Sequence, residues 1–157
     1  MKHFVASLLA VTLVALAPAA FADDPIKQIV DREVPSLKNG SRIPLVEIEK
    51  AILDACARRN FKAVVVSDGL ITARWEHHKH FFEVSIPYTN RAYSIRYKDS
   101  ERMDYDEAKG RIDDAYNEYV GGLSEHIEAD LERALDRLKK SQKSIRKVAR
   151  LNPRYAV

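Results

Sequence analysis

Three histidines lie close together in the sequence, at His77, His78 and His80. Imidazole nitrogen is a good ligand for Zn²⁺ and Cu²⁺, so a short histidine-rich segment is a candidate metal site. His78 and His80 would share one face of an extended strand, because side chains alternate there. The three-ligand spacing of a catalytic zinc site is absent, and a polar hairpin tip explains the same residues. Metal binding by this cluster is therefore an alternative hypothesis and not the leading one.

A second candidate site is the strongly basic C-terminal segment. Residues 137–157 hold eight bases and no acid, whereas residues 101–136 hold 12 acids and four bases. Such a block is typical of a solvated helix end, of a helical homodimer seam, or of a contact with phospholipid, lipopolysaccharide or an acidic protein. Nucleic acid is not expected as a partner, because Tyr155 is the only aromatic residue of the segment. The predicted contact residues are Arg137, Lys139, Lys140, Lys143, Arg146, Lys147 and Arg150.

No catalytic residue is predicted, because the sequence contains none of the common catalytic motifs. G-x-S-x-G, H-E-x-x-H, the phosphate-binding loop and the dinucleotide-binding motif are all missing. Carboxylates are frequent between Asp104 and Asp114, but their spacing singles out no acid–base pair. Cys56 is the only cysteine and lies among helix formers, where a small buried apolar residue is the simplest interpretation. A small hydrolase is the less favoured alternative.

The first 22 residues have the layout of a secretory signal peptide. Lys2 precedes an apolar run at Phe4–Ala17, and Ala20-Phe21-Ala22 supplies small residues at the expected cleavage site. The run of 14 residues is shorter than the roughly 20 residues that a membrane-spanning helix needs. We therefore expect cleavage after Ala22, a periplasmic or secreted location, and no transmembrane segment in the mature chain.

The mature chain is expected to form one domain with extensions at both ends. The whole chain has 157 residues, a formal net charge of +3 and 46% hydrophobic residues, values typical of a folded globular protein. A single cysteine cannot form an internal disulfide, so the hydrophobic core must supply the stability. The expected parts are a signal peptide at 1–22, an extended N-terminal arm at 23–43, an α+β domain at 44–138 and a basic helical tail at 139–157.

Hydrophobic periodicity predicts the elements of the α+β domain. Apolar residues at helical spacing from Ile48 to Cys56 predict a first helix that ends near Arg59. Four alternating or β-branched segments joined by short turns predict a four-stranded antiparallel meander with one covered face. A long amphipathic helix follows from near Arg111, with a kink or local break expected at Gly121-Gly122. Both helices should pack on the apolar sheet face, and the strands are expected at 61–66, 70–76, 80–88 and 92–98.

The element Tyr93-Ser-Ile-Arg-Tyr-Lys-Asp-Ser100 is the most specific part of a longer pattern, which includes Gly69-Leu-Ile-Thr-Ala73, Tyr105-Asp106 and Tyr116-Asn117. With these residues, the segment 48–135 resembles a family of small exported proteobacterial proteins, many of them lipoproteins, without assigned function. This chain differs from that family because it lacks the cysteine of a lipid anchor. The resemblance implies an exported α+β module and carries over no catalytic residue.

Together these observations predict an exported periplasmic binding or envelope-accessory protein without catalytic activity. Its candidate surfaces are the polar sheet edge, the Asp99–Lys109 loop with its tyrosine, and the basic tail. The expected partner is an envelope component or an anionic surface. The alternative is a periplasmic metal-binding protein that holds Zn²⁺ or Cu²⁺ on His77, His78 and His80; no other cofactor is expected.

Overall fold

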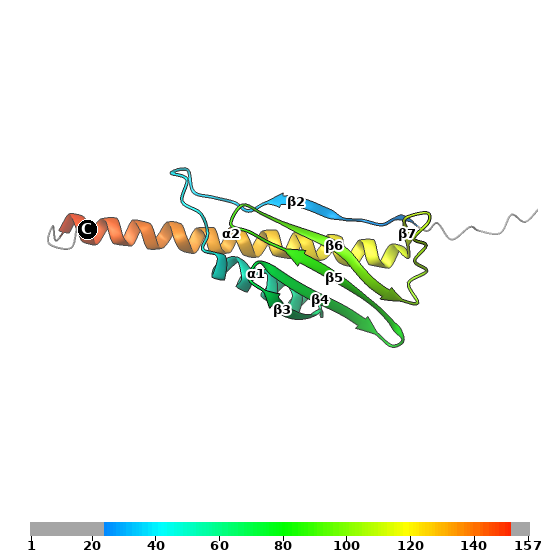
Figure 1. Cartoon of the computed structure of the whole chain (residues 1–157). Helices are drawn as coiled ribbons and strands as arrows, with labels where there is room; N and C mark the ends of the chain where they lie inside the picture. Colours follow the sequence, from blue (N-terminus) through cyan, green and yellow to red (C-terminus); the bar gives the residue numbers. More distant parts are fainter. Residues whose placement is uncertain (1–23, 152–157) are drawn as a thin grey trace, which may run out of the picture.

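Residues 24–151 have an α+β fold with two helices, a five-stranded antiparallel sheet and a short two-stranded antiparallel sheet. The computed structural model describes residues 24–151, so the predicted signal peptide and residues 152–157 of the predicted tail lie outside the described residues. Figure 1 shows the elements in order. They are β1 (Asp24–Pro25), β2 (Ile29–Glu33), α1 (Leu45–Arg58), β3 (Lys62–Ser67), β4 (Leu70–His77), β5 (His80–Pro87), β6 (Ala92–Glu101), β7 (Arg111–Ile112) and α2 (Asp114–Leu151).

Four consecutive strands form the meander that the alternating sequence predicts. β3, β4, β5 and β6 pair in chain order, and each is antiparallel to the next. The turn after β3 requires Gly69, which has a φ of +79°, and an added Cβ there would lie 3.0 Å from the Tyr88 carbonyl oxygen. Alternate residues of the strands are buried, as shown by Phe82, Val84 and Ile86 in β5. One face of the sheet is therefore the core face, as expected.

The sheet has a fifth strand, so the prediction of a four-stranded sheet was wrong. β2, which belongs to the expected N-terminal arm, pairs antiparallel with β6, and Ile29 lies opposite Ile95. The strand has no alternating pattern, because only Ile29 is partly buried and the four residues after it are exposed. A bulge between Ile29 and Arg32 contains Asp31 at a φ of +46°. Hydrophobic periodicity therefore does not predict this strand.

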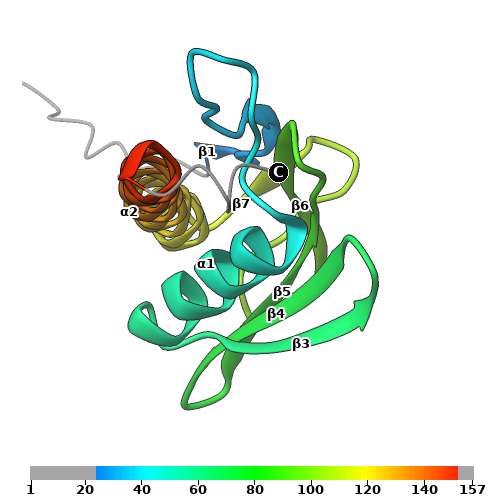
Figure 2. The same cartoon turned by 90° about the vertical axis from the view of Figure 1, so that its left-hand side faces the viewer.

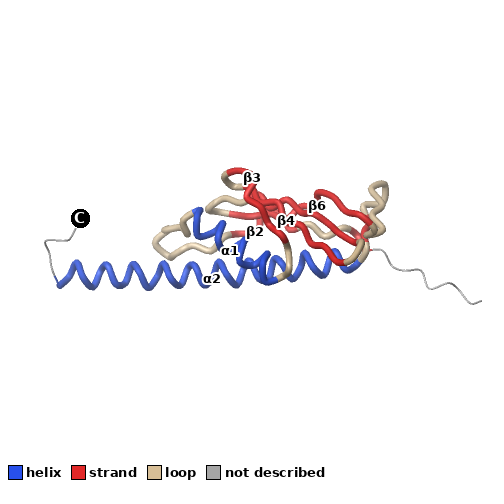
Figure 3. Tube along the Cα trace, turned by 90° about the horizontal axis from the view of Figure 1, so that it is seen from below, coloured by secondary structure: helices blue, strands red, loops and turns tan. Residues whose placement is uncertain are grey.

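Both helices lie on the same side of the sheet (Figure 2). α1 contacts both α2 and β3, so the helices pack on each other as well as on the sheet. α2 lies along the sheet and continues beyond it (Figures 1 and 3). The buried face of α1 confirms the predicted helical stripe and consists of Ile48, Ala51, Ile52, Ala55 and Cys56.

α2 is one continuous helix across Gly121 and Gly122, and it runs straight along its length (Figure 3), so neither the expected kink nor a local break is present. Lysine and arginine side chains from outside α2 occupy the space that a side chain on either glycine would need. An added Cβ at Gly121 would be 2.9 Å from Lys27 Nζ, and one at Gly122 would be 2.6 Å from Arg59 Nη2. The Arg59 guanidinium also lies over the ring of Tyr119, 5.6 Å from its centroid. The glycines thus make room for cations that cross the helix, and tertiary packing offsets their low helix propensity.

An aromatic cluster joins the core face of the sheet to α2. The ring of Phe82 lies 5.5 Å from Trp75 and 4.9 Å from Tyr116, measured between centroids, and the ring of Tyr119 lies 4.3 Å from Trp75. Phe82 and Tyr116 are fully buried, and Trp75 is partly buried. Such aromatic contacts add to the stabilisation that comes from buried area.

Candidate functional site

α2 continues beyond the core as an exposed basic helix. Leu135 is the last buried residue of α2. Residues 139–151 then add about 20 Å of helix, at 1.5 Å per residue. Figure 1 shows this end of α2 projecting past α1 and the sheet. The helical conformation follows from good helix formers, because Lys, Arg, Gln and Leu have high helix propensity.

A cleft of about 810 Å³ lies between the projecting end of α2 and the loop that follows β2. The loop is shaped by Gly40, which has a φ of +81° and whose N–H donates to the Leu37 carbonyl oxygen at 2.9 Å. The Leu37 N–H in turn donates to the Ser41 carbonyl oxygen at 2.9 Å. We call this site the basic cleft; it is lined by Leu37, Lys38, Asn39, Lys139, Gln142, Lys143, Arg146, Lys147, Arg150 and Leu151.

Positive charge in the basic cleft is not neutralised by neighbouring acids. The ion pairs between described residues include none that involves Lys38, Lys143, Arg146, Lys147 or Arg150. No acidic side chain of residues 24–151 lines the cleft. The five cations therefore keep their charge available for an external anion.

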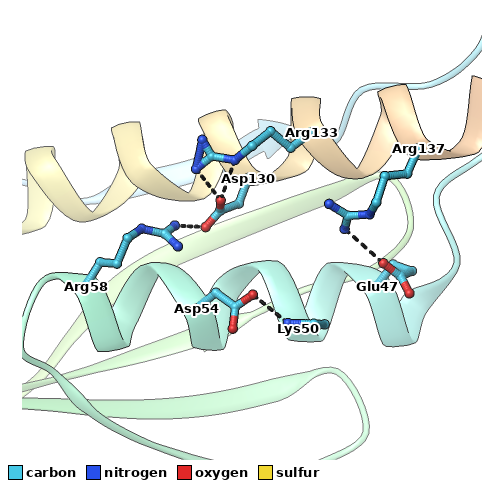
Figure 4. Close-up of polar contacts among 7 residues, drawn as sticks. All are labelled: Glu47, Lys50, Asp54, Arg58, Asp130, Arg133 and Arg137. Atoms are coloured by element: carbon cyan, nitrogen blue, oxygen red, sulfur yellow. Dashed lines mark hydrogen bonds and ion pairs between the residues drawn. The ribbon is translucent and has the colours of Figure 1, made fainter.

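The structure divides the seven predicted contact residues into two groups. Arg137 points towards α1, where its Nη2 donates to Glu47 Oε2 at 3.1 Å (Figure 4). Lys140 is exposed but does not line the cleft. Lys139 lines the cleft, but its Nζ lies 2.9 Å from Asp136 Oδ1. The residues that the helix brings to the cleft are mostly three or four positions apart, which is the spacing of one helix face: Lys139, Lys143, Arg146, Lys147 and Arg150.

Sequence reasoning missed the residues on the other side of the basic cleft. Lys38 and its neighbours Leu37 and Asn39 come from the expected arm, far from α2 in the chain. The Asn39-Gly40 pair signals a turn, but no local pattern shows which helix the turn will approach. Lys38 therefore became a candidate only when the tertiary structure placed it opposite the basic helix.

The same helix end also exposes apolar side chains. Ile145, Val148 and Leu151 are 65%, 52% and 77% exposed. Ile145 lies two turns after Leu138, so it continues the stripe that is buried earlier in α2. The projecting end is therefore amphipathic, because Ile145 and Val148 lie outside the cleft that its basic side lines, whereas Leu151 lies at the edge of the cleft.

The three histidines lie around the turn between β4 and β5. His77 is opposite His80 in the ladder, and the ring centroids of His77 and His78 are 4.2 Å apart. His80 Nδ1–H donates to the Arg102 carbonyl oxygen at 2.6 Å. Between residues 24 and 151, no group of three or more His, Cys, Asp or Glu side chains is placed to hold a metal ion. Metal binding by the three histidines stays a prediction.

The expected loop at Asp99–Lys109 begins later in the structure, because β6 continues to Glu101. Side-chain contacts hold the loop that follows β6 in place. Tyr105 stacks on Tyr97 of β6, with ring centroids 4.3 Å apart. Asp106 accepts a hydrogen bond from the Lys109 N–H at 3.0 Å and pairs with Lys109 Nζ at 2.8 Å. These hydrogen bonds lower the pKa of the Asp106 carboxyl, which keeps it ionised and bound to Lys109.

Cys56 is buried in α1, as the sequence analysis predicts. The side chain is 0% exposed and has no disulfide partner. Burial raises the pKa of its thiol to about 12. Because the thiolate is the nucleophilic form, this cysteine is poorly reactive at neutral pH.

In comparisons with known proteins, no family model, curated protein or solved structure matches the chain. The resemblance to exported proteobacterial proteins therefore stays a prediction. Of the helices in the described part of the chain, none has the length and hydrophobicity to cross a membrane. The basic cleft gathers five of the seven contact residues that the sequence predicts.

Proposed function

We propose that this protein is an exported accessory protein of the cell envelope, without catalytic activity, that binds an anionic surface or partner through the basic cleft. The observation that carries the proposal is a set of five cations around one cleft that have no ion-pair partner among residues 24–151: Lys38, Lys143, Arg146, Lys147 and Arg150. The signal-like N-terminus supports the exported location.

Several cations elsewhere in the fold are paired with acids, unlike these five. Arg32 pairs with Glu128 at 2.7 Å, and Arg74 pairs with Glu83 at 3.2 Å. Solubility alone would not require the basic residues of α2 to lie on one side of the helix, opposite Lys38. Their concentration instead favours a role in binding.

The expected free energy of binding to an anionic surface is large enough to measure. Each Lys or Arg close to an anionic membrane contributes about 1 kcal/mol, so even a partly engaged cleft would retain the protein on such a surface. The attraction is electrostatic and must weaken with salt, because the Debye length falls to about 8 Å at physiological ionic strength.

Retention on anionic phospholipid vesicles tests the proposal, with a soluble polyanion such as polyglutamate as a second probe. The wild type should bind at low salt and dissociate as salt rises. The Lys143→Glu/Lys147→Glu variant should lose binding because it reverses two charges in the cleft. The Lys79→Glu/Arg91→Glu variant is the matched control, since it changes the net charge equally at exposed positions outside the cleft. Failure of the wild type to bind either probe, or equal loss in both variants, would refute the proposal.

Lys38 provides a test of the cleft itself as opposed to the helix alone. If the anion lies between the loop and α2, Lys38→Ala should weaken binding about as much as Lys143→Ala. Lys140→Ala, which removes an exposed lysine of the same helix outside the cleft, should have the smaller effect. Equal effects of the two α2 variants without any effect of Lys38→Ala would mean that the helix binds without the loop.

The metal-binding alternative rests on one observation, the proximity of the His77 and His78 rings. Calorimetric titration with Zn²⁺ or Cu²⁺ tests it. Binding heat that disappears in His77→Ala/His78→Ala would support the alternative, whereas a titration without heat beyond dilution would end it.

A further inference from the structure

The projecting end of α2 carries apolar and cationic side chains on different sides of the helix. Ile145, Val148 and Leu151 follow one another at intervals of three residues, so successive members are neighbours on the helix surface. All three are more than half exposed. Lys143 and Lys147, which line the basic cleft, are each two residues from Ile145. At 3.6 residues per turn, they therefore lie on the side of the helix opposite Ile145.

The fold leaves this apolar side uncovered. Ile127 is fully buried and lies about five turns before Ile145, so the two residues face the same side of α2. Figures 1 and 3 show that α1 and the sheet end before the projecting part of the helix. Neither Ile145 nor Val148 lines the basic cleft. The side of α2 that packs on the core therefore meets solvent from Ile145 onwards.

We infer that the anionic partner of the basic cleft is the surface of a phospholipid bilayer, and that the tip of α2 enters this surface. The inference rests on the proposed function, because it identifies the partner of the same site. Val148 and Leu151 enter the boundary between headgroups and acyl chains. The long side chains of Lys147 and Arg150 keep their charges at the phosphate groups.

The two-sided chemistry of the helix end favours a bilayer over an acidic protein. Residues 137–151 contain no acid that would repel phosphate, so the charge of this end is complementary to either partner. An acidic protein surface that binds the cations would leave the apolar side chains in water. A bilayer offers anionic headgroups and acyl chains next to each other, and it therefore binds both sides of a basic amphipathic helix.

The fold determines how the helix can enter. The apolar side of the projecting end faces the same way as the part of α2 that packs on the core, so a bilayer parallel to α2 would collide with the folded domain. The helix therefore enters at a tilt and with its tip first. Because residues along a helix are 1.5 Å apart, Leu151 should lie deepest, Val148 less deep and Ile145 nearest the headgroups.

An environment-sensitive dye on single introduced cysteines measures this entry. Ile145→Cys, Val148→Cys and Leu151→Cys place the dye along the projecting end. Val30→Cys is the matched control because Val30 is exposed on β2, and the wild type controls for the buried Cys56. Vesicles of anionic phospholipid should shift the dye emission to shorter wavelength most at 151, less at 148 and least at 145, with no shift in the control. Polyglutamate should shift none of them.

Alanine variants test the entry without a dye. Ile145→Ala/Val148→Ala removes two apolar side chains, keeps every charge of the basic cleft and retains good helix formers. Its dissociation constant for anionic vesicles should rise about tenfold or more, whereas its affinity for polyglutamate should equal that of the wild type. Val64→Ala/Val66→Ala is the matched control, since it removes two exposed apolar side chains from β3 and should bind vesicles as the wild type does.

The outcomes separate this inference from the proposed function. Vesicle-bound protein without a shift at 148 and 151, shifts in the reverse order, or unchanged vesicle affinity of Ile145→Ala/Val148→Ala would overturn entry into the bilayer. The proposed function would then stand, with an acidic protein as the partner of the cleft. Failure of the wild type to bind either vesicles or polyglutamate would overturn both.

Discussion

Arg58 at the end of α1 forms an ion pair with Asp130 in the middle of α2. Arg133, one turn later in α2, donates to the other carboxylate oxygen of Asp130, at 2.5 Å from Nη2 and 3.0 Å from Nε (Figure 4). The Asp130 side chain is 9% exposed, whereas those of Arg58 and Arg133 are 41% and 56% exposed. One nearly buried carboxylate thus links the two helices through Arg58, and Arg133 holds the same carboxylate from within α2.

Asp130→Ala should lower the free energy of unfolding by about 1–3 kcal/mol, the usual cost of removing a hydrogen-bonded buried charge. The cost stays below that of breaking a fully buried pair because water can solvate both arginines. Asp54→Ala is the control, since it removes only an exposed pair with Lys50 at 2.7 Å and should cost about 0.5 kcal/mol or less. Urea unfolding measures both variants, and equal losses would show that Asp130 does not link the helices energetically.

The two glycines of α2 should respond differently to alanine. Gly121→Ala should stabilise the protein by about 0.5–1 kcal/mol, because Lys27 can move its flexible end away and alanine is the better helix former. Gly122→Ala should be neutral or destabilising, because three atoms of the Arg59 guanidinium lie within 3.2 Å of the new Cβ. Thermal or urea unfolding of the pair gives the comparison. Equal stabilisation by both variants would show that Arg59 relocates without cost.

Neighbouring phenylalanines on β5 test which face of the sheet is the core face. Phe82→Ala should cost about 3–5 kcal/mol, because it empties a fully buried aromatic site. Phe81 lies on the other face, where the Arg74 guanidinium sits 3.5 Å from its ring centroid. Phe81→Ala should therefore cost about 1 kcal/mol, the value of a partly exposed cation–π contact. Similar losses in the two variants would contradict the assigned strand phase.

Cys56 should make the stability of the protein fall at alkaline pH. Its thiol pKa rises from 9.0 to about 12 on folding because burial disfavours the thiolate. The unfolded chain ionises first, so this contribution is fully present below about pH 9 and is lost as pH rises towards 12. Tyr88, whose pKa burial raises to about 12, adds a dependence of the same sign. Urea unfolding at several alkaline pH values gives the measurement.

The Cys56→Ala variant distinguishes the contribution of the cysteine to this pH dependence from that of the tyrosines. The variant loses stability from the smaller side chain, but it no longer has a thiol to titrate. Its deficit relative to the wild type should therefore shrink as pH rises from about 9 to about 12. A deficit that stays constant over this window would mean that the folded and unfolded thiols titrate alike.

Much of the fold was predictable because local patterns specify it. The meander follows from a side-chain period of two in the strands and from turn residues such as Gly69. The buried face of α1 follows from apolar residues at helical spacing, and the burial of Cys56 follows from its place in that stripe. These features depend on residues close together in the chain, and a single sequence contains that information.

The tertiary structure decided the features that depend on distant residues. β2 is a strand because it pairs with the edge of β6, although its own apolar and polar residues do not alternate. α2 stays continuous at Gly122 because Arg59 occupies the space beside it. The sequence by itself determined that the C-terminal segment is basic, whereas the fold joined Lys38 to that segment and paired Arg137 with Glu47. Such long-range pairs form only when the chain closes large loops, and no local periodicity encodes which pairs will meet.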